Sequence, residues 1–200
     1  NKDYESLKVL LEKGADRKAA DALGKTALYY AVAAGDSEAV KLLREAPPVS
    51  VEGEDPLAVN NQEITQKKTA VFEATENSNR SMLEVLVELN ADLNIPNNEG
   101  ETPLMYAAKT KDIETLRKLL ELGADVNKKN GSKEKETTVV HEMVSSGNLE
   151  VLKCLGEANG YPYAKPTMSA DGNGSFPIHI ATFHVSQFSY PFIIVLLIGW

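Results

Sequence analysis

The chain has 200 residues, of which 42% are hydrophobic and 25% are charged, and its formal net charge is −8. This composition fits one soluble folded domain, and the sequence has no basic stripe to neutralise phosphates, which excludes a nucleic-acid binder. The single cysteine, Cys154, excludes an intramolecular disulfide framework, so we expect a reducing compartment, the cytoplasm.

Two sequence blocks recur along the chain and define a repeating unit. The clearest copies read Thr-Pro-Leu-Met-Tyr-Ala at residues 102–107 and Leu-Leu-Glu-Leu-Gly-Ala-Asp at residues 119–125. Copies of the first block are anchored by Thr26, Thr69, Thr102 and Thr138, with Phe176 in the matching place. Their separations of 43, 33, 36 and 38 residues indicate a 33-residue period with insertions of 10, 3 and 5 residues. We place these insertions in loops, because a helix cannot absorb one without shifting its buried face.

The predicted units follow one another in chain order. They are a partial unit at 1–20, a unit with the long insertion at 21–63, units at 64–96, 97–132 and 133–170, and an atypical, truncated unit at 171–200. The first helix of a unit is expected to begin after the anchor threonine, whose hydroxyl can accept a first-turn N–H. Pro103 and Pro177 follow at the first helical position, where a missing N–H loses no hydrogen bond.

The second helix of each unit carries a stripe of apolar residues spaced by three and four, which predicts one buried helical face. The stripe consists of Leu7, Val9, Leu10, Leu11, Ala39, Val40, Leu42, Leu43, Leu83, Val85, Leu86, Leu116, Leu119, Leu120, Val151, Leu152 and Leu155. Cys154 aligns with Leu42 in this stripe, so we expect it in the core rather than as a nucleophile.

The ends of these second helices are marked by residues that tolerate a left-handed backbone. Gly14 and Gly123 occupy the position just past the helix, and Asn90 and Asn159 occupy it in two weaker copies. Pro47 is the exception because proline cannot adopt a positive φ. The helix before Pro47 must therefore end by another route.

Together these blocks resemble the ankyrin-repeat family, whose unit is a turn followed by two antiparallel helices and whose signature contains Thr-Pro-Leu-His-x-Ala. The resemblance runs from Leu7 to at least Ala181. It implies an all-α solenoid of about five and a half units, forming one domain over residues 1–200. It also implies a protein–protein interaction scaffold, with no cofactor and no reaction of its own, that uses a concave face and the loop tips.

By this resemblance, the contact positions lie around the tip of each turn and late in each first helix. They are Leu23, Lys25, Tyr30, Lys68, Glu73, Glu76, Asn98, Glu99, Glu101, Tyr106, Lys109 and Glu142. Tyr30 and Tyr106 share one slot of the unit and are candidate anchors, although each ring could instead only pack over a neighbouring first helix. The loop containing Tyr161 and Tyr163 is a second candidate surface, because it is rich in aromatic residues and proline.

The excess negative charge is concentrated in one stretch of the chain. Residues 47–101 contain 3 basic and 11 acidic side chains. One interpretation is a solvated acidic face that aids solubility; the other is an electronegative stretch that steers a basic partner protein or peptide.

A catalytic or metal-binding role for the histidines is not favoured. His141 and His179 occupy one slot of the unit, where the resemblance implies a ring that hydrogen-bonds turn backbone groups. Other units fill this slot with Tyr29, Phe72 and Met105, so no chemistry is shared. The alternative from another class is a hydrolase or transferase after Gly160. Its candidate residues match no motif and are His179, His184, Asp171 and Lys165.

Two asparagines raise the question of modification. Asn94 and Asn127 end matching segments that resemble the sites that asparaginyl hydroxylases modify in ankyrin repeats. Asparagine at this slot also satisfies turn backbone in the family generally, so the sequence leaves both interpretations open.

The C-terminal segment, residues 192–200, is apolar throughout but is far shorter than the ~20 residues that cross a bilayer, so no membrane insertion is predicted. It is similar to the second helix of a sixth unit, and we expect further residues or another surface to cover it. The chain could alternatively be the recruiting or targeting part of a larger protein. Examples are an enzyme, the cytosolic part of a membrane channel, or a microbial effector that would act in the host-cell cytoplasm.

Overall fold

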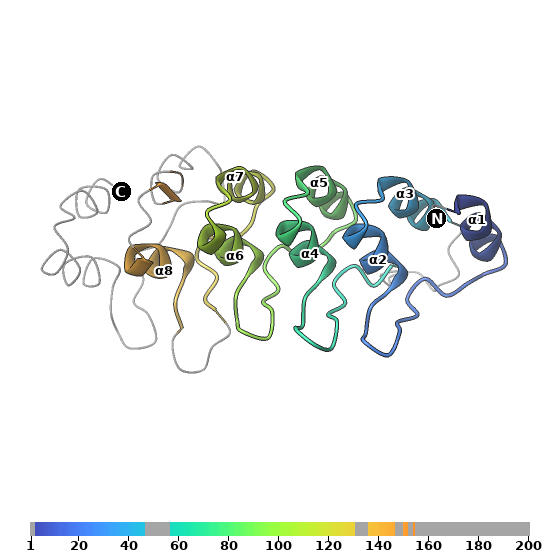
Figure 1. Ribbon diagram of the computed structural model, residues 1–200, viewed down its shortest axis with the longest axis horizontal. Helices are drawn as coiled ribbons and strands as arrows, with labels where there is room; N and C mark the ends of the chain where they lie inside the picture. The colour runs from blue at the N-terminus through green and yellow to red at the C-terminus, as the bar shows by residue number, and fades with distance from the viewer. Residues whose placement is uncertain (1–2, 47–56, 131–135, 147–149, 152–153, 155–200) are drawn as a thin grey trace, which may run out of the picture. The chain divides into compact units, whose positions relative to one another are not determined.

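The computed structural model describes residues 3–46, 57–130, 136–146, 150–151 and 154 (Figure 1). Helices α1–α5 belong to one compact unit, Asn1–Asn97, and helices α6–α8 belong to a second, Asn98–Trp200. The eight helices of the described residues are α1 (Tyr4–Glu12), α2 (Ala27–Ala33), α3 (Ser37–Glu45), α4 (Ala70–Glu76), α5 (Arg80–Glu88), α6 (Pro103–Thr110), α7 (Ile113–Glu121) and α8 (Val139–Ser146). None of them is long and apolar enough to span a membrane.

Each compact unit is built from helix pairs, which confirms the expected all-α fold. In the first unit, α2 packs against α3 and α4, while α4 packs against α5 and α1 packs against α3. Helices α2 and α4 therefore form one layer and α1, α3 and α5 form the other (Figure 1). In the second unit, α6 packs against both α7 and α8.

The anchor threonines cap the first helices, as predicted. The hydroxyl oxygens of Thr26, Thr69 and Thr102 each accept the backbone N–H three residues later, at 3.2–3.3 Å. Pro103 is the first residue of α6. At the start of α8, a histidine makes the hydrogen bond: the backbone N–H of Thr138 donates to Nδ1 of His141 at 3.3 Å. This bond confirms the role that the resemblance implies for His141.

The second helices are capped by residues that the sequence analysis did not single out. The side chains of Asp3, Asp36, Asn79 and Asp112 each accept an N–H from the first turn of α1, α3, α5 and α7. These side-chain oxygens accept backbone N–H groups of the first turn that would otherwise lack an intrahelical partner.

The predicted helix ends are confirmed where the structure describes them. Gly14, Asn90 and Gly123 have φ values of 81°, 63° and 98°. Asn159 lies outside the described residues.

Asn90 offers a test of this backbone requirement at a single position. We expect Asn90→Ala to lower the free energy of unfolding by about 1 kcal/mol, because alanine is strained at positive φ. Asn90→Gly should raise it by about 0.5 kcal/mol, because glycine adopts this conformation without a Cβ clash. Urea unfolding followed by circular dichroism measures both changes. Equal stability of the two variants would show that φ at residue 90 does not limit the end of α5.

Helix α3 ends without a left-handed residue, as the position of Pro47 requires. Ala46 is extended, with φ −58° and ψ 143°. Arg17 is only 6% exposed, and its guanidinium donates to the backbone carbonyls of Leu43 at 2.8 Å and Ala46 at 3.3 Å. A buried arginine thus takes over the role that a C-terminal glycine plays in other units. Pro47 itself lies outside the described residues.

The buried stripe is confirmed for most of its members, but the prediction for α1 is wrong at Val9 and Leu10. Their exposed fractions are 52% and 57%, whereas Leu11 is buried. Among the described elements α1 packs against α3, and this contact leaves Val9 and Leu10 exposed. The buried members, Cys154 included, are Leu11, Val40, Leu43, Leu83, Leu86, Leu116, Leu119, Leu120, Val151 and Cys154. Leu7, Ala39, Leu42 and Val85 are partly exposed, and Leu152 and Leu155 lie outside the described residues.

Candidate functional site

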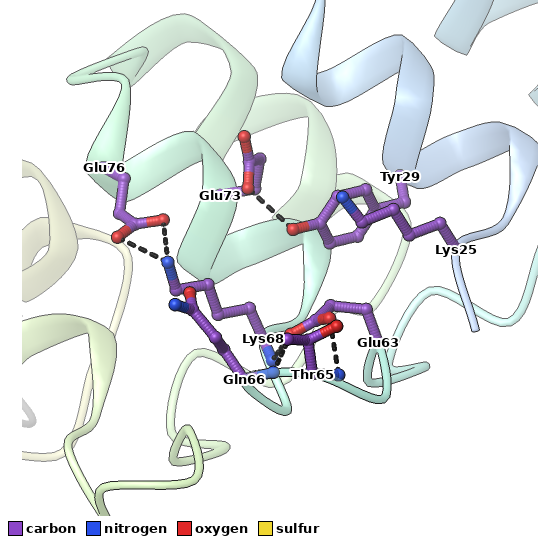
Figure 2. A pocket seen from close by; sticks show the side chains of 8 residues that line it. All are labelled: Lys25, Tyr29, Glu63, Thr65, Gln66, Lys68, Glu73 and Glu76. Atoms are coloured by element: carbon purple, nitrogen blue, oxygen red, sulfur yellow. Dashed lines mark hydrogen bonds and ion pairs between the residues drawn. The ribbon is translucent and has the colours of Figure 1, made fainter. Parts of the chain in front are cut away.

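A polar hollow of about 370 Å³ lies beside α2 and α4 in the first unit (Figure 2). It is lined by Lys25, Tyr29, Glu63, Thr65, Gln66, Lys68, Glu73 and Glu76. Tyr29 comes from α2, Glu73 and Glu76 come from α4, and the other side chains come from the turns that precede these helices. We refer to this feature as the Glu73 hollow.

Tyr29 and Glu73 join the two helices at the hollow. The Tyr29 hydroxyl donates to Glu73 Oε2 at 2.7 Å, and the Lys25 ammonium lies 5.0 Å from the centre of the Tyr29 ring (Figure 2). Burial raises the pKa of Tyr29 strongly, and the hydrogen bond to Glu73 and the negative charges of Glu73, Glu63 and Glu76 raise it further. The hydroxyl therefore remains protonated at neutral pH and available as a donor.

Lys68 and Glu76 form an ion pair within the hollow. The ammonium lies 2.6 Å from one carboxylate oxygen of Glu76 and 2.7 Å from the other. The side chains are only 15% and 22% exposed, so this pair is better shielded from solvent than a surface pair. Lys68 also lies 5.8 Å from the centre of the Phe72 ring. Lys68 is thereby fixed in place rather than extended into water.

Glu63 stabilises the turn before α4, which lines the hollow. Its buried carboxylate accepts the backbone N–H groups of Thr65, Gln66 and Lys68. Burial alone would raise the pKa of Glu63, but these N–H groups outweigh burial and lower it. The charge of Glu63 is thus largely satisfied by its own turn.

The tips of two successive turns in the first unit are linked and apolar. Ile64 N donates to the carbonyl of Leu23 at 2.8 Å, and the side-chain amide of Asn61 donates to the carbonyl of Gly24 at 2.7 Å. Leu23 is 48% exposed and Ile64 is 68% exposed. Because Lys25 and Thr65 of the same turns line the Glu73 hollow, this apolar tip adjoins it.

The second unit carries a related charge cluster. Lys109 Nζ lies 2.5 Å from Glu101 and 3.9 Å from Glu99, and the hydrogen bond to Glu101 raises the pKa of Lys109. Glu101 and Lys109 occupy the same two repeat positions as Lys68 and Glu76, with the charges exchanged.

Half-buried Glu142 of α8 belongs to the same cluster. It accepts the Thr137 hydroxyl at 3.0 Å, and burial raises its pKa while that bond opposes the shift. The nearby charge of Glu101 raises the pKa of Glu142 further.

The structure groups the sequence-predicted contact residues into these features. Lys25, Lys68, Glu73 and Glu76 line the Glu73 hollow; Glu99, Glu101, Lys109 and Glu142 form the cluster of the second unit. Leu23, Tyr30 and Asn98 are exposed, Tyr106 is partly buried on α6, and Tyr161 and Tyr163 lie outside the described residues. The Tyr30 hydroxyl donates to Asp21 at 2.6 Å, which ties that ring to its own turn.

Four lining residues of the hollow were missed by sequence reasoning: Tyr29, Glu63, Thr65 and Gln66. A signal for Glu63 existed, since a polar side chain also starts the equivalent turns at Asp21 and Asn130. Each of the three donates its backbone N–H to the carbonyl of the residue just before the anchor threonine. In the described part of the chain, no cluster of histidine, cysteine, aspartate or glutamate side chains is placed to hold a metal ion.

Comparisons with known proteins agree with the helix-pair architecture. A family model described as ankyrin repeats (3 copies) matches residues 49–130, and a model described as ankyrin repeats (many copies) matches residues 1–44. Among solved structures, the ankyrin repeat domain of Bcl-3, titled a unique member of the IkappaB protein family, superimposes with a TM-score of 0.78. The match is 20% identical and covers 98% of this chain and 77% of that one, which supports the fold alone. A search of curated protein sequences gave no match.

Proposed function

The chain belongs to the ankyrin-repeat family, and from this premise we propose that it is a protein-interaction module without a reaction of its own. Its partner is a protein or peptide that docks on the face formed by the turns and the first helices. In the first unit this face carries the Glu73 hollow. In the second unit, the turn and the first helix carry the Lys109 cluster.

The observation that carries the proposal is the exposed apolar tip beside a polar hollow. Leu23 and Ile64 on the two linked turns, and Tyr30 on α2, are each about half exposed or more. Most other large apolar side chains of the described residues are buried. Exposed apolar and aromatic side chains gathered beside convergent polar groups are typical of binding surfaces.

The character of the partner follows from charge. The acidic excess of residues 47–101 would attract a basic partner and speed its association. A cytoplasmic location remains a prediction from cysteine usage, and the single cysteine, Cys154, is buried.

The proposal is tested by comparing two faces of the protein. The full chain is used to isolate a partner from lysate, and the dissociation constant of the identified partner is then measured by calorimetry. We expect Tyr30→Ala combined with Tyr106→Ala to weaken binding at least tenfold, because aromatic anchors dominate such interfaces. Leu10→Ala is the control, since Leu10 is equally exposed but belongs to the layer of second helices.

The control variant should bind within twofold of the wild-type chain. Melting curves confirm that each variant is folded. A larger loss for Leu10→Ala than for the tyrosine variant would move the binding surface to the second helices and contradict the proposal.

A further inference from the structure

The carboxylates of the Glu73 hollow differ in how they are neutralised. Glu63 accepts three backbone N–H groups of its own turn, and Glu76 pairs with Lys68. Among the described residues, the partners of Glu73 are neutral: the Tyr29 hydroxyl at 2.7 Å and the Asn77 side-chain amide at 3.3 Å. The ion pairs found among the described residues do not include Glu73. The described part of the chain therefore supplies no cation to pair with this partly buried carboxylate.

The two lysines of the hollow do not supply that cation. Lys68 is held by both oxygens of Glu76, and the Lys25 ammonium lies over the face of the Tyr29 ring (Figure 2). The raised pKa of Tyr29 reflects burial first, then the hydrogen bond to Glu73, and then the charges of Glu73, Glu63 and Glu76. Three carboxylates and two lysines line the hollow, so a further positive group would be attracted to Glu73.

The dimensions of the site suit one long side chain. A volume of about 370 Å³ is near the lower end of ligand-binding pockets, which run from about 300 to 1,000 Å³. Besides Glu73, the lining includes Gln66 and Thr65, whose side chains carry an amide oxygen and a hydroxyl. These groups accept hydrogen bonds from an ammonium or a guanidinium.

The apolar tip, Leu23 and Ile64, offers a second contact for a partner segment that enters the hollow. Leu23 and Ile64 are held together by the bond between Ile64 N and the Leu23 carbonyl. Lys25 is two residues from Leu23, and Thr65 is adjacent to Ile64, so the tip and the hollow belong to the same turns. An extended segment that fills the hollow would place a neighbouring side chain over the tip.

We propose that the Glu73 hollow holds the basic side chain of an extended partner segment, lysine or arginine, with an adjacent apolar residue on Leu23 and Ile64. This inference rests on the proposed function and specifies the chemistry that the first unit selects. Glu73 provides the charge, and the tip provides the apolar contact that fixes the register of the segment.

The test uses an immobilised peptide library in which one position of a random heptapeptide is fixed as Arg, Lys, Gln, Glu or Leu. The full chain should capture the Arg and Lys pools at least tenfold better than the Gln pool, and an apolar residue should be enriched beside the fixed position. Glu73→Gln should reduce this ratio at least fivefold, while glutamine keeps an oxygen that can accept the Tyr29 hydroxyl. Glu38→Gln is the matched control, because it removes the same charge from an exposed position on α3 and should leave the ratio within twofold.

A second variant separates the two contacts. Leu23→Ser with Ile64→Ser should abolish the apolar preference and retain the preference for a basic residue.

Several results would overturn the inference. These are capture without any charge preference, preference for the Glu pool, a basic preference that survives Glu73→Gln, and no capture of any pool by a folded chain. Each leaves the proposed function intact, because that function is decided separately by the tyrosine variant and the natural partner.

Discussion

Phe72→Ala is expected to lower the free energy of unfolding by about 3–5 kcal/mol, the largest loss that we predict for a single substitution. Phe72 is fully buried on α4, which packs against α2 on one side and α5 on another. Removal of the ring takes away its apolar contacts and leaves a cavity that the short surrounding helices can fill only in part. Since repeats are stabilised mainly by their neighbours, the loss should extend across the first unit.

Urea unfolding of the full chain, followed by circular dichroism, measures this effect. Phe72→Leu is the conservative control and should cost less than about 1.5 kcal/mol, because it keeps much of the apolar volume. Leu10→Ala removes a large side chain from an exposed position and should cost less than about 0.5 kcal/mol. A loss below about 1.5 kcal/mol for Phe72→Ala would mean that the ring is not part of the core.

Local chemistry explains why the helix boundaries could be predicted from the sequence. A threonine that accepts the N–H three residues later, or an asparagine at φ 63°, depends on only a few neighbouring residues. The same local rule accounts for Pro103 at the start of α6. Such preferences act within one helix, and the repeat pattern then predicts which helices pair.

Features that depend on contacts between distant residues were not predictable in the same way. Apolar spacing alone placed Val9 and Leu10 in the core, although burial depends on whether another element covers that face of α1. Arg17 lies 26 residues before Leu43, and no local pattern connects its guanidinium with the end of α3. The sequence showed that this helix needs an unusual end, but the residue that provides it is apparent only in three dimensions.

The candidate site divides along the same line. Lys25, Lys68, Glu73 and Glu76 could be predicted because their repeat slots place them on the turn and the first helix. Tyr29 was missed because its slot is a core position, and only the structure shows that its hydroxyl reaches a carboxylate 44 residues later in the chain. The slot of Tyr30 and Tyr106 is exposed in the first unit and partly buried in the second, so slot alone does not determine exposure.

Arg17→Met is expected to lower the free energy of unfolding by about 2–3 kcal/mol. The substitution keeps an unbranched side chain in a buried position but removes the donors to the carbonyls of Leu43 and Ala46. A hydrogen bond from a charged donor contributes about 1.5–3 kcal/mol, and the loss of the buried charge offsets part of this effect. Arg17→Lys should give an intermediate loss, because an ammonium lacks the planar fork of the guanidinium.

Arg44→Met is the matched control for this change. Arg44 makes a hydrogen bond of the same length, 2.8 Å, but to Glu88 with both side chains at least half exposed. Exposed pairs of this kind contribute about 0–1 kcal/mol, so this variant should stay close to the wild-type chain in urea unfolding. A loss for Arg17→Met no larger than that for Arg44→Met would contradict the role of Arg17 at the end of α3. The expected gap between the two arginines follows from burial, because the buried carbonyl of Leu43 cannot bond to water in place of the lost donor.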